Sequence, residues 1–164
     1  MDKIDKVLEV FYEHPEKRFT VRKIAEMTGI PRSTAQSYIS ELRKQNLITK
    51  KNTAQNTLLF KTKKINYFIE RIVSSELIDK LISELKPSCI ILFGSFRKGD
   101  SVKESDIDIF IESPIKNEPD LRKYEKTLGH GIQLFIETDI KNLQLRLFNN
   151  VVNGIKLYGA FKIK

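Results

Sequence analysis

Apolar positions in the first sixty residues recur every three or four residues, the spacing typical of amphipathic helices. The first such stretch, residues 4–11, stops before Pro15, because proline disfavours helical geometry in the residue that precedes it. A second stretch follows Thr20, a good N-cap, and ends at Gly29, a common residue after a helix. The pattern therefore predicts two short helices.

A third helix and a hairpin are predicted next. Pro31 suits the first turn of a helix, and residues 35–42 carry its apolar face. Two short apolar segments, 47–48 and 58–60, are strand candidates separated by a polar stretch. Helix, helix, tight turn, helix and hairpin is the order of a winged helix.

Residues 64–85 read as a helical connector with two apolar stripes, broken and recapped at residues 74–75. The connector contains no Gly/Ser-rich or acidic linker, so we expect the two halves of the chain to be coupled through packed helix. The same apolar stripe is also compatible with the interface of a homodimer.

The second half of the chain has the pattern of an α/β domain. Residues 89–93 form a continuous apolar run that predicts a buried strand and ends at Gly94. Alternation over residues 105–111 predicts another strand with Asp106 and Asp108 on one face. We expect strands at approximately 88–94, 106–112, 131–138 and 155–159, with the last at an edge, and flanking helices at 118–129 and 143–152.

Charge is concentrated in the first part of the chain. The 164 residues carry a formal net charge of +8, and residues 1–63 hold 13 Lys or Arg against 7 Asp or Glu. A basic module suggests a polyanionic partner, although excess lysine also serves solubility. One cysteine, no signal-like N-terminal segment and no long apolar run favour a cytoplasmic protein that is not associated with a membrane.

The segment FTVRKIAEMTGIPRSTAQSYISELRKQNLITK resembles the winged helix-turn-helix modules of prokaryotic transcription regulators. The resemblance implies DNA binding through residues 1–63, with the third helix in the major groove. The positions expected to face the bases are Arg32, Ser33, Thr34, Gln36 and Ser37. The expected phosphate contacts are Arg43, Lys44, Lys50, Lys51, Lys61 and Lys63. A winged helix that binds a protein instead of DNA is the alternative.

Residues 94–108 carry the candidate chemistry. Gly94 lets the backbone approach a ligand closely, and the N–H groups that follow it, with the Ser95 hydroxyl, suit phosphate oxygens. Arg97 and Lys98 add positive charge beside that turn. The two aspartates repel each other unless a cation lies between them, and Mg²⁺ is a hard cation that prefers oxygen ligands.

The glycine-serine turn followed by Ser105-Asp106-Ile107-Asp108 resembles the DNA polymerase beta-like nucleotidyltransferases, most closely their minimal members in archaea and bacteria. The resemblance covers roughly residues 86–164. It implies that Gly94 and Ser95, with Arg97, Lys98 and Ser105, bind ATP or another nucleoside triphosphate. It also implies that Asp106 and Asp108 are catalytic and hold Mg²⁺ or Mn²⁺. Related proteins often act as antitoxins, which implies a helical toxin as a possible protein acceptor.

The match departs from the family at the third carboxylate. The position that holds an acid in active members is Gln133 here, and a neutral amide supplies neither an anionic ligand nor a base. Glu104 is a possible substitute, whereas Glu137 lies too far along its strand. Two functions remain open: a transferase that modifies a protein or small-molecule hydroxyl, and a nucleotide-sensing transcription regulator with weakened catalysis. His130, between two glycines, is expected to be structural or solvent-exposed.

The expected fold class is α/β (α+β). We expect a winged helix-turn-helix over residues 1–63, the connector over 64–85, and a nucleotidyltransferase fold with a small mixed sheet over 86–164.

Overall fold

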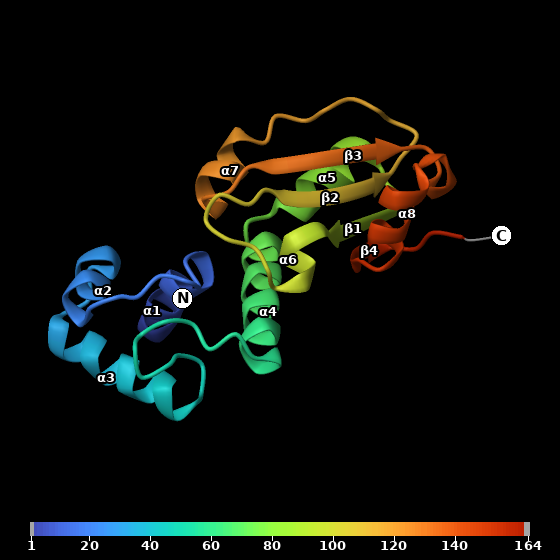
Figure 1. Cartoon of the computed structure of the whole chain (residues 1–164). Helices are drawn as coiled ribbons and strands as arrows, with labels where there is room; N and C mark the ends of the chain where they lie inside the picture. Colours follow the sequence, from blue (N-terminus) through green and yellow to red (C-terminus); the bar gives the residue numbers. More distant parts are fainter. Residues whose placement is uncertain (1, 163–164) are drawn as a thin grey trace. The chain divides into compact units, whose positions relative to one another are not determined.

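The structure, a computed structural model, describes residues 2–162 (Figure 1). Residue 1 and residues 163–164, at the outer ends of the expected ranges 1–63 and 86–164, lie outside this part. The chain divides into two compact units, Met1–Lys64 and Ile65–Lys164, which are described separately below. No helix within residues 2–162 has both the length and the apolar character needed to cross a membrane.

The first unit contains three helices whose ends follow the capping residues in the sequence. These helices are α1 (Lys3–Glu13), α2 (Val21–Thr28) and α3 (Arg32–Lys44). The Thr20 hydroxyl accepts a hydrogen bond from the backbone N–H of Lys23 at 3.2 Å, and Gly29 ends α2 with a left-handed φ of 67°. The rings of Phe11 and Phe19 meet edge to face with centroids 5.8 Å apart. The predicted helices are therefore confirmed.

The predicted hairpin is wrong in its second strand. Within the described residues, the region after α3 holds a single antiparallel bridge, between Ile48 and Ala54. Residues 58–60 are instead the first turn of helix α4 (Leu58–Ser74). The Thr57 hydroxyl accepts from the Phe60 N–H at 3.2 Å and caps the start of this helix. A three-residue apolar run fits a strand or a helix equally well, and the cap selects the helix.

A pair of loops closes the first unit beside α3. The Phe19 N–H donates to the Asn52 carbonyl at 3.1 Å, and the Asn52 side-chain amide donates to the Phe19 carbonyl at 2.9 Å. The Asn52 side-chain oxygen also accepts from Arg43 at 2.5 Å. Asn52 has a φ of 56°, a conformation that asparagine tolerates better than most residues. This residue therefore ties the loop after α3 to the start of α2.

The second unit contains the rest of α4, further helices and a mixed sheet. Its elements are α5 (Leu77–Leu85), β1 (Cys89–Phe93), α6 (Gly94–Lys98), β2 (Ile107–Glu112), α7 (Arg122–Leu128), β3 (Ile132–Glu137), a 3₁₀ turn (Ile140–Asn142), α8 (Leu145–Val152) and β4 (Ile155–Gly159). The expected break after α4 is present, because the Ser75 hydroxyl donates to the Ile72 carbonyl at 2.8 Å and Glu76 has a φ of 66°. The helices expected at 118–129 and 143–152 are both shorter than predicted.

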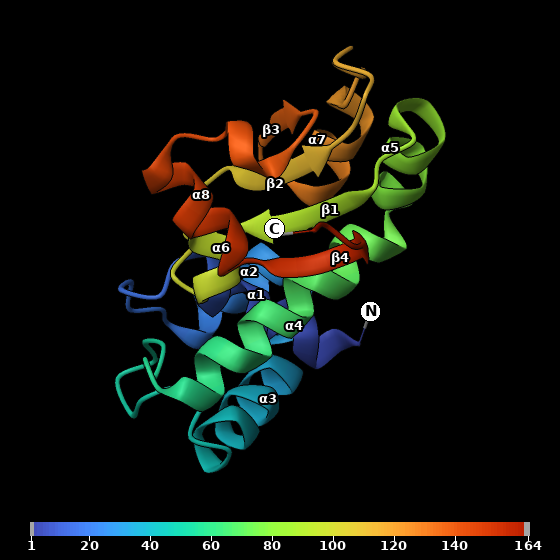
Figure 2. The same cartoon turned by 90° about the vertical axis from the view of Figure 1, so that its right-hand side faces the viewer.

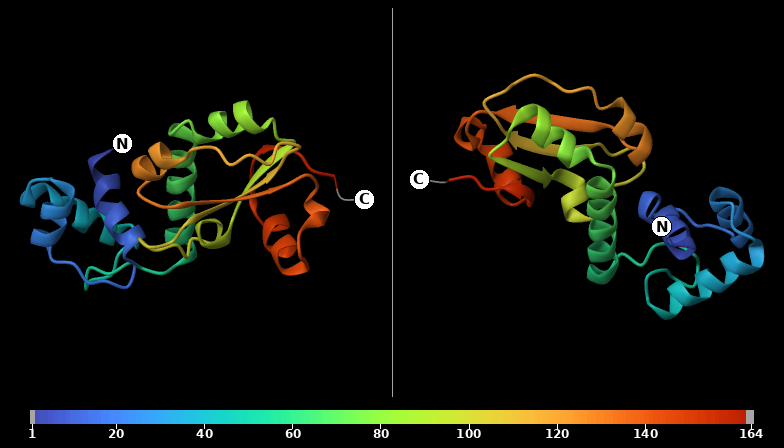
Figure 3. Two further views of the ribbon diagram at one scale, coloured as in Figure 1. Left: turned by 90° about the horizontal axis from the view of Figure 1, so that it is seen from above. Right: turned by 180° about the vertical axis from the view of Figure 1, so that it is seen from behind.

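The sheet has the strand order β3-β2-β1-β4. Strand β1 is antiparallel to both β2 and β4, whereas β2 and β3 run parallel. Figures 2 and 3 show α5 and α8 on opposite faces of this sheet. Every residue of β1 is buried, as the continuous apolar run predicted. The expected α/β fold class is therefore confirmed.

An apolar cluster lies on the sheet face that carries Asp108. Cys89, Ile91, Phe93 and Phe110 are buried there against Val151 of α8. Burial raises the pKa of the Cys89 thiol to about 11, so it is a packed hydrophobe and remains protonated at neutral pH.

We expect Asn52→Ala to lower the free energy of unfolding by about 1–3 kcal/mol, because it removes hydrogen bonds to Phe19 and Arg43. Urea denaturation followed by circular dichroism measures this change. Asn52→Gly is the matched control, since glycine adopts the left-handed φ without strain, and it should be less destabilising than alanine. Unchanged denaturation midpoints in both variants would contradict the assigned role of Asn52.

Candidate functional site

The sequence motif and the third strand meet at one edge of the sheet. Because β1 is antiparallel to β2 and β2 is parallel to β3, the end of β1 lies beside the beginnings of β2 and β3. Phe93 is the register partner of Asp108, and Asp108 is the register partner of Gln133. Asp108 and Gln133 therefore project from the same face of neighbouring strands.

Asp108 lies directly against the backbone of Gly94. A Cβ atom added to Gly94 would collide with the Asp108 carboxylate, and Gly94 has a φ of 69°. Both facts require glycine at this position. The glycine at the end of β1 therefore lets the aspartate approach the turn into α6, where the sequence places the phosphate-binding groups.

Asp106 is supported in the same way by Gly131. A Cβ at Gly131 would collide with Asp106 Oδ1, and the Gly131 carbonyl accepts from the Ile107 N–H at 2.8 Å. Asp106 lies one residue before β2, so the predicted strand begins slightly too early at this point. The two aspartates occupy alternate positions, and the intervening Ile107 is fully buried.

His130 positions the segment that leads to the aspartates. Its ring is buried, and Nδ1 lies 2.9 Å from the Ser105 carbonyl oxygen. The ring packs edge to face on Phe68 and Phe96, with centroids 5.5 and 4.9 Å away. The Ser105 hydroxyl accepts from the Val102 N–H at 2.9 Å. The expectation that His130 is structural agrees with these contacts, and the alternative that it is solvent-exposed is wrong.

The two carboxylates influence each other electrostatically. Desolvation by burial raises the pKa of Asp108, and the negative charge of Asp106 raises it further. Asp106 itself is exposed. A bound cation between the two groups would relieve their repulsion.

The remaining groups of the motif line the turn after β1. Gly94 and Ser95 begin the short helix α6, and this differs from the simple turn that was expected. The Ser95 carbonyl accepts from the Asp100 N–H at 3.0 Å. Arg97 is half-buried and Lys98 is exposed. Gly94, Ser95, Arg97 and Lys98 therefore all belong to α6, the helix that follows β1.

Of the residues considered for the third acidic position, Glu137 lies away from the aspartate pair. Glu137 is the register partner of Glu112, at the opposite end of the strands, and forms an ion pair with Lys116 at 3.0 Å. Gln133 is exposed and is the β3 residue opposite Asp108. Glu104 is also exposed, in the segment before β2.

The donor set suits a cation that shares its ligands with a substrate. Residues 2–162 contain no group of three or more Asp, Glu, His or Cys side chains arranged to hold a metal ion by themselves. Divalent cations such as Mg²⁺ are commonly held by one or two carboxylates together with substrate phosphates. Asp106 and Asp108 fit that second mode.

In the first unit, the polar face of α3 is exposed to solvent. Arg32, Ser33, Gln36 and Ser37 are exposed, and Thr34 is partly exposed. The expected phosphate contacts Lys44, Lys50 and Lys51 are exposed as well, whereas Lys61 and Lys63 lie on α4 and not in a wing.

Arg43 is the exception among the expected phosphate contacts. It is partly buried and donates to Asn52. Arg43 also lines a hollow of about 640 Å³ together with Lys44 and Lys50.

Sequence reasoning missed two supporting residues, Gly131 and the acidic Glu125. The Glu125 carboxylate accepts from the Ile132 N–H at 3.1 Å and so fixes the start of β3. The glycines on either side of His130 were the available signal for a close backbone contact there. No local pattern marks Glu125, because its partner is brought near only by the fold.

Comparisons with known proteins agree with this geometry. The family model described as "Nucleotidyltransferase domain" matches residues 74–138, and the one described as "IclR helix-turn-helix domain" matches residues 2–51. A Methanocaldococcus jannaschii protein named "Putative protein adenylyltransferase" is 36% identical over 69 residues, covering 38% of this chain and 69% of that protein. No solved structure matches. The chain therefore belongs to the nucleotidyltransferase domain family, and it joins that domain to an N-terminal helix-turn-helix DNA-binding domain.

Proposed function

We propose that the protein transfers a nucleoside monophosphate, AMP in the first instance, from a nucleoside triphosphate to a hydroxyl group of a protein. The observation that carries the proposal is the pair Asp106 and Asp108, held against Gly131 and Gly94 beside the turn into α6. The name of the M. jannaschii relative supports ATP as the nucleotide and a protein as the acceptor.

In this proposal each group of the motif has one task. The backbone at Gly94 and the Ser95 hydroxyl bind the triphosphate, with Arg97 and Lys98 adding positive charge. Asp106 and Asp108 would hold Mg²⁺ or Mn²⁺, and the cation would neutralise negative charge on the reacting phosphate. Ser105 and His130 keep the two carboxylates in place through the segment before β2.

The reaction joins the acceptor oxygen to the α-phosphorus. The bond between the α-phosphorus and its bridging oxygen breaks, pyrophosphate leaves, and the acceptor proton passes to water. Gln133 lies where a third carboxylate would assist this step, and its neutral amide cannot accept the proton. The proposed enzyme is therefore slower than one that carries an acid at this position.

A second function is favoured by the same glutamine. A domain that binds nucleotide and metal without efficient transfer would act as the sensor of a transcription regulator, with the helix-turn-helix unit as its output. The discriminating quantity is pyrophosphate released per protein, since both functions predict nucleotide binding.

The first test is transfer of label from ATP, CTP, GTP and UTP in the presence of Mg²⁺ or Mn²⁺, with cell extract as acceptor. We expect the Asp106→Asn/Asp108→Asn variant to lose at least about 100-fold in rate, a loss typical of removing transition-state electrostatic stabilisation. Asp79→Asn on α5, exposed and outside the motif, should retain the wild-type rate. Equal labelling by the wild type and the double variant would exclude transfer at this site.

Replacing Gln133 with aspartate tests the missing carboxylate. We expect Gln133→Asp to raise the transfer rate about tenfold, because it places an anionic ligand and proton acceptor opposite Asp108. Gln133→Asn has the shape of aspartate without its charge and should not accelerate transfer. Rates that are the same in both variants would show that a third carboxylate does not limit the reaction.

DNA binding is tested with duplexes selected from a random pool by the whole chain. We expect Lys50→Ala with Lys51→Ala to reduce the salt slope of log Kd by roughly 2, because each lost phosphate contact removes about 0.9. Arg32→Ala should relax sequence preference instead. The Asp106→Asn/Asp108→Asn variant should bind the same DNA as the wild type, and loss of binding there would contradict separate sites.

A further inference from the structure

Strand β3 is an edge strand whose outer backbone groups point away from the sheet. The Gly131 carbonyl accepts from Ile107, and the Glu137 carbonyl accepts from Ser113, each at 2.8 Å. In a parallel pair, the residues between them at odd positions also face β2. The even positions, Ile132, Leu134 and Ile136, therefore present their N–H and C=O groups at the outer edge.

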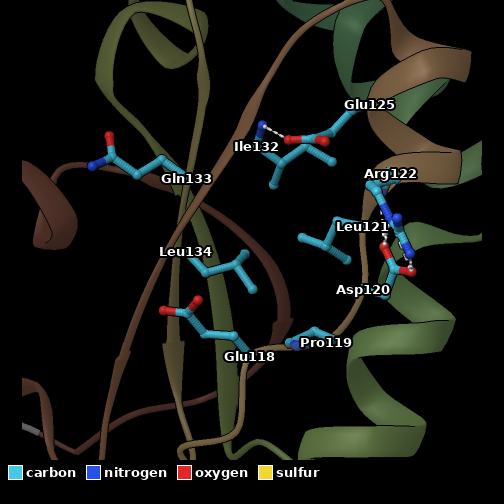
Figure 4. A pocket seen from close by; sticks show the side chains of 9 residues that line it. All are labelled: Glu118, Pro119, Asp120, Leu121, Arg122, Glu125, Ile132, Gln133 and Leu134. Atoms are coloured by element: carbon cyan, nitrogen blue, oxygen red, sulfur yellow. Dashed lines mark hydrogen bonds and ion pairs between the residues drawn. The ribbon is translucent and has the colours of Figure 1, made fainter.

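A groove follows this edge on its outer side. A hollow of about 640 Å³ is lined by residues 132–134 on one side and by residues 118–122 with Glu125 on the other (Figure 4). At the start of the strand, Glu125 already accepts from the Ile132 N–H at 3.1 Å. Near the end of the strand, Lys116 and Glu137 form their ion pair at 3.0 Å. Residues 133–136 of β3 lie between these two contacts, a length of about 13 Å, and the groove lies beside the first part of this stretch.

The charge of the groove is opposite to that of the protein. Its lining includes Glu118, Asp120 and Glu125 against one cation, Arg122, in a chain of net charge +8. Arg122 is paired with Asp120 at 2.6 Å, and its hydrogen bonds lower the pKa of Asp120 to about 2. Glu118 is exposed. The groove therefore favours a segment that carries positive charge.

The groove also adjoins the carboxylate pair. Gln133 lines the groove and is the register partner of Asp108. Neighbouring strands are about 4.8 Å apart, so a segment paired with β3 would lie about 10 Å from the backbone of Asp108. Long side chains of such a segment, or the residues that follow it, reach the site from this position.

We propose that the edge of β3 docks an extended segment of the acceptor protein, bearing lysine or arginine, as an additional strand of the sheet. The proposal rests on the transferase function proposed above. Backbone hydrogen bonds to Leu134 and Ile136 supply affinity that does not depend on the side chains, as in other cases of strand addition. Glu118 supplies the preference for positive charge.

The probe is a fluorescein-labelled octapeptide of alternating lysine and threonine, titrated by fluorescence anisotropy into the whole chain without nucleotide. Its counterpart with glutamate in place of lysine is the charge control. We expect the lysine peptide to bind at least about tenfold more tightly than the glutamate peptide, and to slow hydrogen exchange at the Leu134 and Ile136 amides.

Two variants separate the contributions of charge and backbone. Glu118→Lys should weaken binding about tenfold, and Asp79→Lys, the same charge change on exposed α5, should weaken it far less. Leu134→Pro removes an N–H on the outer side only, a change that an edge strand tolerates, and should abolish binding while circular dichroism stays native. Equal losses in the Asp79 and Glu118 variants, or native affinity in a folded Leu134→Pro, would overturn the proposal.

Different results would contradict the docking of a segment at β3 and the transferase function. The Asp106→Asn/Asp108→Asn variant keeps the β3 edge and Glu118, so it should still bind the peptide, and Leu134→Pro should still abolish that binding. Complete loss of binding in the aspartate variant would place the peptide at the carboxylates and overturn the docking proposal. Peptide binding in a wild type that releases no pyrophosphate would remove the transferase and leave the docking edge intact.

Discussion

The site depends on the close approach of two carboxylates to glycine backbone. Asp108 occupies the space where any other residue at position 94 would have its Cβ, and Asp106 does the same at Gly131. Two like charges near each other are unfavourable in a partly desolvated place, and the raised pKa of Asp108 expresses that cost. Ile107, Ile109 and Ile111, at alternate positions of β2, are buried. Rotating the strand to separate the two carboxylates would expose these isoleucines, so their burial opposes the repulsion.

Most of the chain's regular structure was predictable because its signals are local. Thr20 and Gly29 mark the ends of α2, and the apolar run before Gly94 marks β1. The positions of Asp106 and Asp108 followed from the period of two in a strand. Each of these features can be predicted from the geometry of a single helix or strand.

Two kinds of feature could not be predicted: segments whose apolar pattern fits two elements equally well, and contacts whose partners are distant in sequence. Residues 58–60 suit a strand or a helix by pattern, and the hydroxyl of Thr57 decides between them. Asn52 forms a hydrogen bond with Phe19, which is 33 residues away in the sequence. The Glu125 carboxylate accepts a hydrogen bond from the Ile132 N–H, and this contact requires α7 to lie beside β3. The groove along β3 arises from the path of residues 118–122, which no periodicity encodes.

The acidic lining of that groove has a second physical effect. A free strand edge invites pairing with the same edge of another copy, which is a common start of aggregation. Two copies joined through β3 would each bring an acidic groove lining to the shared edge, with Glu118, Asp120 and Glu125 against the single cation Arg122. Like charges would make such self-pairing costly, whereas a chain of opposite charge would meet no such repulsion at the same edge.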